Sequence, residues 1–311
     1  MKKHLFLHQL FNQPLLVLPD VLHEAVAWAG GRMGINLQQV NIQLPALASA
    51  DLGQPAMQAP AQPTASQQQG VLTIPVHGIL VPRANDVGLC SNQTSYESIR
   101  QQLNAGLADP AIGHIVLDLA TPGGAAVGCF ELAADIRAAT ARKPVTAIVH
   151  YTAYSAGYAL ASACSEIVLS QSAGVGSIGV IIKHLDISQQ LAEKGIVVTT
   201  LYRGEHKNDM ASEAPLSEAA LATVNTLLDR HYQQFCQQVA AHRGLDIGAV
   251  QATQAGLFFG ADAVVAGLAD RVETQQQTID RIAGQLARSS SAFVHRMHAT
   301  GIAMHMKIAC N

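Results

Sequence analysis

The sequence predicts an α/β protein, because short apolar segments rich in β-branched residues alternate with helix-like segments. Segments such as VLTIPVHGILV (71–81) and HIVLDLA (114–120) are apolar almost throughout, which is typical of parallel strands buried on both faces of a sheet. Of the 311 residues, 49% are hydrophobic, but only 5% are aromatic and 13% are charged. We therefore expect a closely packed core built from Ala, Val, Leu and Ile.

The charge and cysteine content narrow the class of protein. Nineteen Lys and Arg stand against 22 Asp and Glu, and no basic run is present, so we expect no nucleic-acid partner. So small a share of charged residues in an apolar chain suggests that part of the surface is buried against other subunits. The cysteines are odd in number and scattered without a CxxC motif, which argues for a reducing, cytoplasmic compartment. They are Cys90, Cys129, Cys164, Cys236 and Cys310.

The N-terminal region reads as a separate extension. Its start carries Lys2 and Lys3 like a signal peptide, but polar residues soon interrupt the apolar stretch, so we expect no signal peptide. No window of 18 apolar residues predicts a membrane span. We assign residues 1–53 to the extension, with one helix at Val21–Met33, and residues 54–70 (QPAMQAPAQPTASQQQG) to a flexible linker.

A regular α/β domain is expected at residues 71–272, followed by a tail at 273–311 that is helical and then featureless. Beyond the two segments above, strands are expected at 145–150, 166–170 and 196–202, with a glycine-punctuated loop and strand at 174–182. Helices are expected at 96–107, 130–140, 156–164, 187–194 and 216–243, and the segment GADAVVAGLADRV (260–272) predicts a short helix and a last strand.

In open α/β sheets, functional groups collect in the loops just beyond the carboxyl ends of the strands. The first such loop is TPGG (121–124). Gly123 and Gly124 can leave backbone N–H groups uncovered, as an oxyanion hole requires, but a plain strand-to-helix turn explains them equally simply.

The second loop is YSAG (154–157), which opens a helix. Ser155 can be only an N-cap residue, or it can be an exposed nucleophile with the Ala156 N–H beside it. The third loop contains Lys207. A lysine serves as a base only when its amine is neutral, and Ser177 could orient that amine; the plainer interpretation is a solvated surface lysine.

The order of the motifs TPGG, YSAG, GSIG and GEHK resembles the signal peptide peptidase A (SppA) family of serine–lysine peptidases, over about residues 71–272. The resemblance implies a ClpP/crotonase-like fold with repeated ββα and βαβ units. It implies that Ser155 is the nucleophile, that Lys207 is the general base and that Ser177 holds the lysine amine. The oxyanion hole would come from Gly123, with Gly124 and Ala156 beside it.

Other segments resemble the capsid-assembly proteases of lambdoid tailed phages, namely LFNQPLLVLPD, VLTIPVHGILVPR and SIGVIIKHLDISQQLAEKGIVVTTLYRGEHK. This resemblance implies that the substrates are capsid-associated proteins such as a portal or scaffold protein, and the protease itself. It also implies a homo-oligomer in the host cytoplasm or procapsid, with no cofactor and no metal. Because only 39 residues follow the domain, we expect no scaffolding activity in this chain.

Several alternatives remain open at this point. They are a cellular SppA-like protease that degrades membrane-derived peptides, an inactive capsid component, and a crotonase-type acyl-CoA enzyme using Glu131 and Asp135. A Ser-His-Asp triad would need His150 with Asp118, and Cys129 could be a nucleophile instead of a small buried residue.

Overall fold

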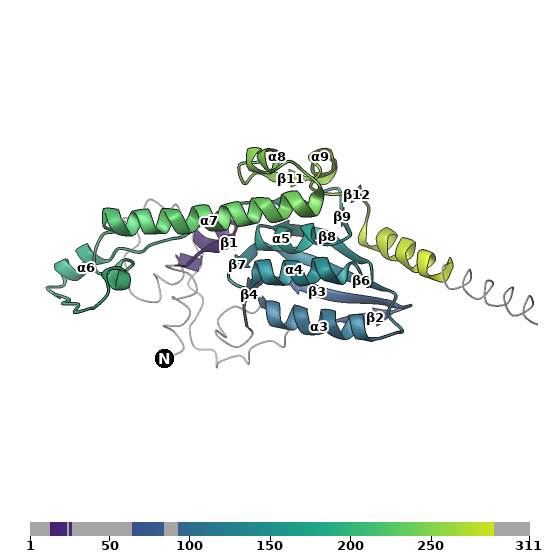
Figure 1. Cartoon of the computed structure of the whole chain (residues 1–311), viewed down its shortest axis with the longest axis horizontal. Coiled ribbons are helices and arrows are strands. Elements are labelled where there is room, and N and C mark those ends of the chain that lie inside the picture. The colour runs from purple at the N-terminus through teal and green to yellow at the C-terminus, as the bar shows by residue number, and fades with distance from the viewer. Residues whose placement is uncertain (1–12, 24, 27–63, 84–92, 289–311) are drawn as a thin grey trace, which may run out of the picture.

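The computed structural model describes residues 13–23, 25–26, 64–83 and 93–288. Two sheets and a layer of helices form the body of this region (Figure 1). The strands are β1 (Leu15–Val17), β2 (Ser66–Gln68), β3 (Val71–His77), β4 (Ile79–Val81), β5 (Gln93–Ser95), β6 (His114–Thr121), β7 (Gly123–Ala125), β8 (Val145–Tyr154), β9 (Glu166–Leu169), β10 (Gly174–Gly176), β11 (Leu257–Phe259) and β12 (Arg271–Val272).

Helices α3, α4 and α5 cover one face of the larger sheet, and the long helix α7 runs alongside α5 (Figure 1). Within the described residues no helix is long and apolar enough to cross a bilayer. The helical elements are α3 (Tyr96–Ala108), α4 (Cys129–Ala139), α5 (Ala156–Ser162), α6 (Ser188–Glu193), the 3₁₀ turn η2 (Glu205–Asn208), α7 (Glu218–Arg243), α8 (Ile247–Ala252) and α9 (Gly260–Val265).

The larger sheet has the order β11-β10-β8-β6-β3-β2, and β9 joins it beside β8. Its central pairs β3–β6, β6–β8 and β8–β10 are parallel. The smaller sheet has the order β1-β7-β4-β5. Twice, a strand of the larger sheet leads into the smaller sheet and then into a helix: β3 into β4 and β5 before α3, and β6 into β7 before α4. The α/β class with repeated ββα units is therefore confirmed.

The helices begin and end where local chemistry favours it. Ser95 caps α3 by accepting a hydrogen bond from the Ser98 N–H (3.1 Å), and Ile99 and Leu103 lie on its buried face. Ser217 caps α7 in the same way, and Gly244 ends it with a left-handed φ of 65°.

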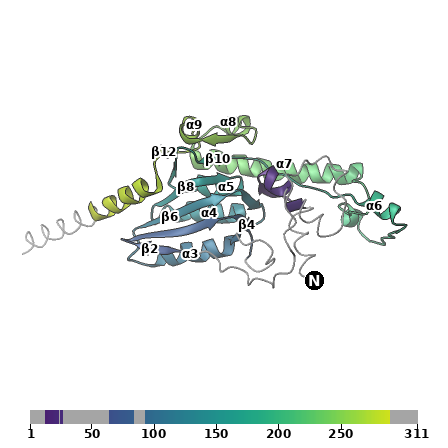
Figure 2. The same cartoon turned by 180° about the vertical axis from the view of Figure 1, so that it is seen from behind.

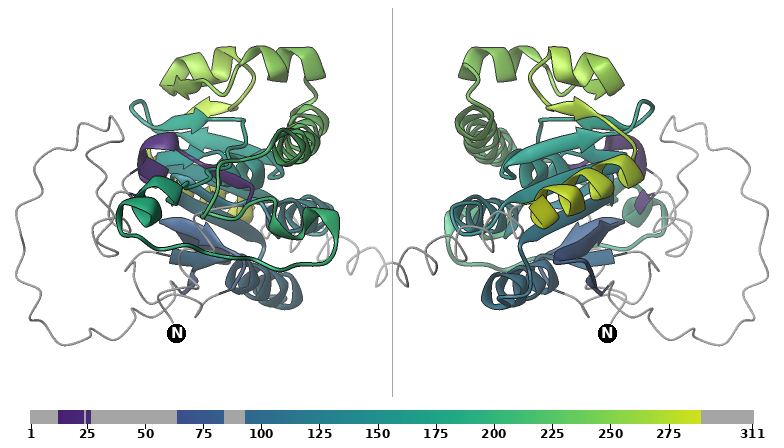
Figure 3. Two further views of the ribbon diagram at one scale, coloured as in Figure 1. Left: turned by 90° about the vertical axis from the view of Figure 1, so that its left-hand side faces the viewer. Right: turned by 90° about the vertical axis from the view of Figure 1, so that its right-hand side faces the viewer.

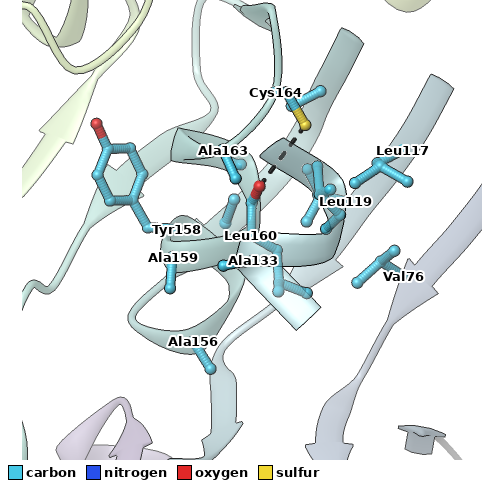
Figure 4. Packing of buried hydrophobic residues seen from close by; sticks show 14 of the residues in the cluster. Val76, Leu117, Leu119, Ala133, Ala156, Tyr158, Ala159, Leu160, Ala163 and Cys164 are labelled. Carbon is cyan, nitrogen blue, oxygen red and sulfur yellow. Dashed lines mark hydrogen bonds between the residues drawn. The ribbon is translucent and has the colours of Figure 1, made fainter. Parts of the chain in front are cut away.

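The core is made of small and branched side chains, as the composition predicts. Figure 4 shows α5 within it: Ala156, Ala159 and Leu160 of this helix are buried in the same cluster as Leu117 and Leu119 of β6. Because such close packing leaves little space, larger side chains on α5 would be poorly tolerated.

A helical segment at residues 275–288 packs against the larger sheet at the N-terminal halves of β3, β6 and β8 and extends outward beyond it (Figures 2 and 3). Its Ile282 packs against Val71, Val116 and Ile148. The helical part of the predicted tail is thus an element of the fold, joined to one end of the sheet through Ile282.

Some elements differ from their predicted extent. The segment 71–81 is two strands, because Gly78 turns the chain with a φ of 70°. Ser66–Gln68, at the end of the predicted linker, pairs with β3 as an edge strand. Residues 196–202 are not a strand: they are exposed, and the described chain offers their backbone no neighbouring strand. The predicted helix at Val21–Met33 lies largely outside the described residues.

Candidate active site

Ser155 is the single residue between β8 and α5, and it holds an unusual conformation. Its φ is 53° and its ψ is −112°, a combination of backbone angles that residues other than glycine rarely adopt. Its N–H donates to the Gly176 carbonyl (2.9 Å), and its own carbonyl accepts from the Ala159 N–H (2.9 Å). Backbone strain of this kind persists only where the surroundings hold it, and it is frequent at functional sites.

The turn at Ser155 is tightly enclosed. Ser155 is 1% exposed, and its hydroxyl donates to the Gly179 carbonyl at a long 3.5 Å. A Cβ on Gly157 would collide with the methyl group of Thr121, so this position requires a glycine. The start of α5 is therefore pressed against the end of β6, where TPGG begins.

Ser177 occupies the equivalent position on the neighbouring strand. Because β10 pairs parallel with β8 in the register Gly176 to Tyr154, Ser177 follows β10 as Ser155 follows β8. Its φ is 54°, it is 7% exposed, and its N–H donates to the Gly256 carbonyl (2.9 Å). The structure thus brings Ser155 and Ser177 into adjacent loops.

Gly123 and Gly124 belong to a strand, β7, instead of a turn. The Gly123 N–H donates to the Thr121 hydroxyl (3.1 Å). A Cβ on Gly123 would collide with the Leu16 carbonyl, and one on Gly124 would collide with the Leu80 carbonyl. Both positions therefore need glycine because backbone lies against them on either side, a reason that the TPGG motif alone did not reveal.

The neighbour of β7 on its outer side is β1, an element that the sequence analysis did not predict. Leu15–Val17 runs antiparallel to Gly123–Ala125, with Val17 opposite Gly123. The apolar run PLLVLP between two prolines was the signal that could have indicated a strand. β1 thereby lies along the glycine strand that the resemblance assigns to the oxyanion hole.

Lys207 lies elsewhere. It is exposed in η2, on a projecting arm formed by residues 182–216, and α6 on this arm lies far from α5 along the long axis of the molecule (Figures 1 and 2). Its neighbour His206 pairs with Asp209 (2.8 Å). Among the described residues, no hydrogen bond joins Lys207 to Ser155 or Ser177. One chain alone therefore does not assemble the predicted dyad.

The geometry disfavours the alternative triad. Asp118 pairs with His77 (Nε2 to Oδ2, 3.0 Å), and the hydrogen bond to Asp118 raises the pKa of His77. Among the described contacts Asp118 has none with His150. Cys129 is buried, and burial raises the pKa of its thiol to about 12, so it is a core residue and not a nucleophile.

The carboxylates that a crotonase-type reaction would need lie on the outside. Glu131 and Asp135 are exposed on α4, and Asp135 pairs with Arg100 (2.6 Å). In the described part of the chain, no group of three or more His, Cys, Asp or Glu residues could hold a metal ion. His295, His298 and His305, which could also be considered as metal ligands, lie outside the described residues.

Comparisons with known proteins concern the family and the overall similarity of the chain. Residues 137–288 match the model of peptidase family S49, a range that includes Ser155, Ser177 and Lys207 but starts after Gly123 and Gly124. Among solved structures, an enoyl-CoA hydratase/isomerase family member is similar over 74% of this chain and 76% of its own, with a TM-score of 0.39 and 15% identity.

Two curated phage proteins are similar over most of the chain. The head-tail preconnector protein GP5 of Enterobacteria phage P21 is 33% identical over 89% of this chain and 56% of its own length. The capsid assembly protease C of Escherichia phage lambda is 32% identical over 86% of this chain and 63% of its own length. The chain thus spans under two thirds of either relative. Residues 137–288 of this chain thus match peptidase family S49, and most of the chain is similar to two phage proteins.

Proposed function

We propose that this chain is a serine endopeptidase of the serine–lysine type that cuts capsid-associated proteins during phage assembly. The observation that carries the proposal is the Ser155 turn, strained and held by the backbone between β8 and α5, with Ser177 beside it. The family match supports peptide hydrolysis. The names of the two phage relatives support a capsid protein, such as a portal or scaffold protein, as the substrate.

The proposed reaction follows the logic of a nucleophile and a general base. The neutral amine of Lys207, oriented by Ser177, takes the proton of the Ser155 hydroxyl, and Oγ attacks the peptide carbonyl carbon. The oxyanion is stabilised by backbone N–H groups of the hole formed by Gly123, Gly124 and Ala156. The C–N bond breaks as the protonated lysine gives its proton to the leaving amine, and water then hydrolyses the acyl-enzyme.

The lysine is supplied by a second copy of the chain. Lys207 lies on an arm that exposes apolar side chains, and Val197 and Leu201 are each 89% exposed. Burying these side chains against a neighbouring subunit is favourable by roughly 25 cal/mol per Å² of apolar surface. Such docking carries η2 of one copy towards the body of the next, so the dyad forms between copies and the protein works as a homo-oligomer.

A mixing experiment tests both the chemistry and its arrangement. Ser155→Ala and Lys207→Ala are each expected to abolish cleavage of a co-expressed capsid protein, as followed by mass spectrometry. Co-assembled, the two variants recover part of the parent's activity, because the first supplies an intact lysine and the second an intact serine.

Control variants distinguish a wrong nucleophile from a lysine that acts within its own chain. A double variant, Ser155→Ala/Lys207→Ala, co-assembled with either single variant gives no recovery. Lys207→Arg is also inactive, since a guanidinium does not release its proton at usable pH. Cleavage by Ser155→Ala would remove Ser155 as the nucleophile, and absence of recovery in the mixture would show that the lysine acts within its own chain.

A further inference from the structure

We propose that β1 is an internal occupant of the peptide-binding groove, and that an extended apolar peptide binds by taking its place along β7. The inference rests on the proposed function only in regarding the incoming peptide as a substrate. The groove is defined by two backbone edges, β7 on one side and the segment that starts at Ile181 on the other.

β1 is bound at both of its edges, as a peptide would be when held by strand addition. Towards β7, the Leu18 N–H donates to the Pro122 carbonyl (3.0 Å), and the Ala126 N–H donates to the Pro14 carbonyl (3.3 Å). Towards the other edge, Leu15 exchanges two hydrogen bonds with Ile181 (2.9 and 3.0 Å). This two-sided ladder recognises backbone atoms, which any extended segment can offer.

The side chains of β1 alternate between two apolar environments. Leu16 is fully buried in the main core cluster. Leu15 and Val17 belong to a separate cluster with Leu22, against which Ile181 packs. A replacing peptide therefore needs a bulky aliphatic residue at the position of Leu16 and apolar residues on either side of it.

The pairing of β1 with β7 directs the C-terminal end of β1 towards the catalytic residues of the proposed function. Val17 lies opposite Gly123, at the end of β7 that follows Thr121. The second edge begins two residues after Gly179, whose carbonyl accepts the Ser155 hydroxyl. The chain of β1 thus runs through the groove towards the Gly123 end, where a peptide would have to present its carbonyl.

The burial of Ser155 agrees with an occupied groove. With β1 in place Ser155 is 1% exposed, which leaves no room for a second peptide at its hydroxyl. Withdrawal of residues 14–18 would free both backbone edges together, because this one short segment supplies the hydrogen bonds to both. We infer that departure of β1 is the step that admits a substrate.

A reversible lock tests the proposal without relying on catalysis. In a Ser155→Ala chain, Leu15→Cys and Ile181→Cys place two thiols at directly opposed positions, where a disulfide can form. The probe is a fluorescent peptide, QPLLVLPD, which copies residues 13–20. Its binding, measured by anisotropy, is expected to be about tenfold weaker in the oxidised protein and to recover on reduction in the same sample.

A second variant loosens the strand. Leu15→Pro removes the N–H that donates to Ile181 and is expected to tighten binding of the same peptide about tenfold, whereas Leu15→Val keeps the N–H and binds like the parent. Ile181→Cys alone is insensitive to oxidation. A peptide with Asp at the position that corresponds to Leu16 does not bind, because this position is buried in the apolar core.

The outcomes distinguish this inference from the proposed function. Equal affinity in the oxidised and reduced states, or no binding in any variant, overturns the inference even if the parent chain cleaves peptides. The expected binding pattern, together with a parent chain that carries Ser155 and cleaves no capsid protein, upholds the occupied groove and overturns the peptidase proposal. Should Leu15→Pro not fold, the lock still decides, since its two states are compared in one folded sample.

Discussion

Ser155 and Ser177 both hold a φ above 50°, a region that normally selects glycine. Each follows a parallel strand directly, and each has its N–H fixed by a backbone carbonyl, to Gly176 and Gly256 respectively. The cost of such a conformation, about 1–3 kcal/mol, is met by this surrounding network. Replacing either serine by glycine would relieve the strain but would also remove the hydroxyl that the strained turn presents.

At the same scale, His114 makes the stability of the fold depend on pH. Its side chain is buried beside the Thr146 hydroxyl (2.9 Å), and burial lowers its pKa from 6.5 to about 4. The unfolded chain takes up this proton as the pH falls below 6.5, but the folded chain does not, so acid favours unfolding. Between pH 7 and pH 5 we expect a loss of about 2 kcal/mol from this group.

Urea unfolding at the two pH values measures this loss. Other histidines titrate in the same range, so the test is the difference between the parent and His114→Gln, which has no imidazole at this position. An equal fall in the unfolding free energy of both proteins would show that folding does not lower the pKa of His114.

The sequence could indicate the candidate residues but not all of their surroundings. Ser155 and Ser177 stand in motifs with a recognisable spacing, and the structure brings their loops together. The hydrogen bond from Gly123 to the Thr121 hydroxyl, and the β1 backbone against Gly123, depend on pairing between distant segments. Local patterns carry no information about such pairing.

At the scale of elements, α7 is a helix with two different halves. Its C-terminal half packs into the core, where the rings of Phe235 and Phe130 lie 6.0 Å apart. Its N-terminal half is mostly exposed, and Leu221 is 49% exposed. One half therefore belongs to the body, and the other half carries the base of the projecting arm.

This asymmetry predicts unequal effects of truncation. Phe235→Ala leaves a cavity among fully buried residues and is expected to cost about 3–5 kcal/mol of unfolding free energy. Leu221→Ala on the same helix is expected to cost less than about 0.5 kcal/mol. Chemical unfolding of the two variants compares them directly; a large loss from Leu221→Ala would mean that this half is already covered by another surface.

Periodicity predicted most elements to within a few residues, including α3, α4 and β6, because their apolar faces meet one core. It failed at residues 196–202, where an apolar, β-branched run has the pattern of a strand but no partner in the described chain. It also missed β1, since three residues are too few for a period to appear. Strand formation depends on a neighbour, which a local pattern does not contain.

At the scale of the whole molecule, we expect the projecting arm (residues 182–216) to hold copies of the chain together. Leu201→Asp places a charge on a side chain that is 89% exposed in the single chain and, in our proposal, buried in the oligomer. We expect the assembled species to fall at least tenfold in abundance and peptidase activity to fall with it. Light scattering and cleavage assays on the same preparation measure both.

The matched control is Val265→Asp on α9, since Val265 is also 89% exposed but lies away from the arm. It is expected to assemble like the parent. If both variants assembled normally, the arm would not be the contact between copies, and the exchange of Lys207 between subunits would lose its basis.

If β1 occupies the groove as we propose, its attachment to the same chain sets a concentration threshold for peptidase activity. A covalently tethered occupant competes at an effective concentration on the order of millimolar, however dilute the protein itself is. A peptide dispersed in solution loses that competition, whereas proteins crowded together inside a closing shell approach the same concentration. An enzyme built in this way stays silent while its substrates are scattered and turns on when they have been gathered, with no separate activator.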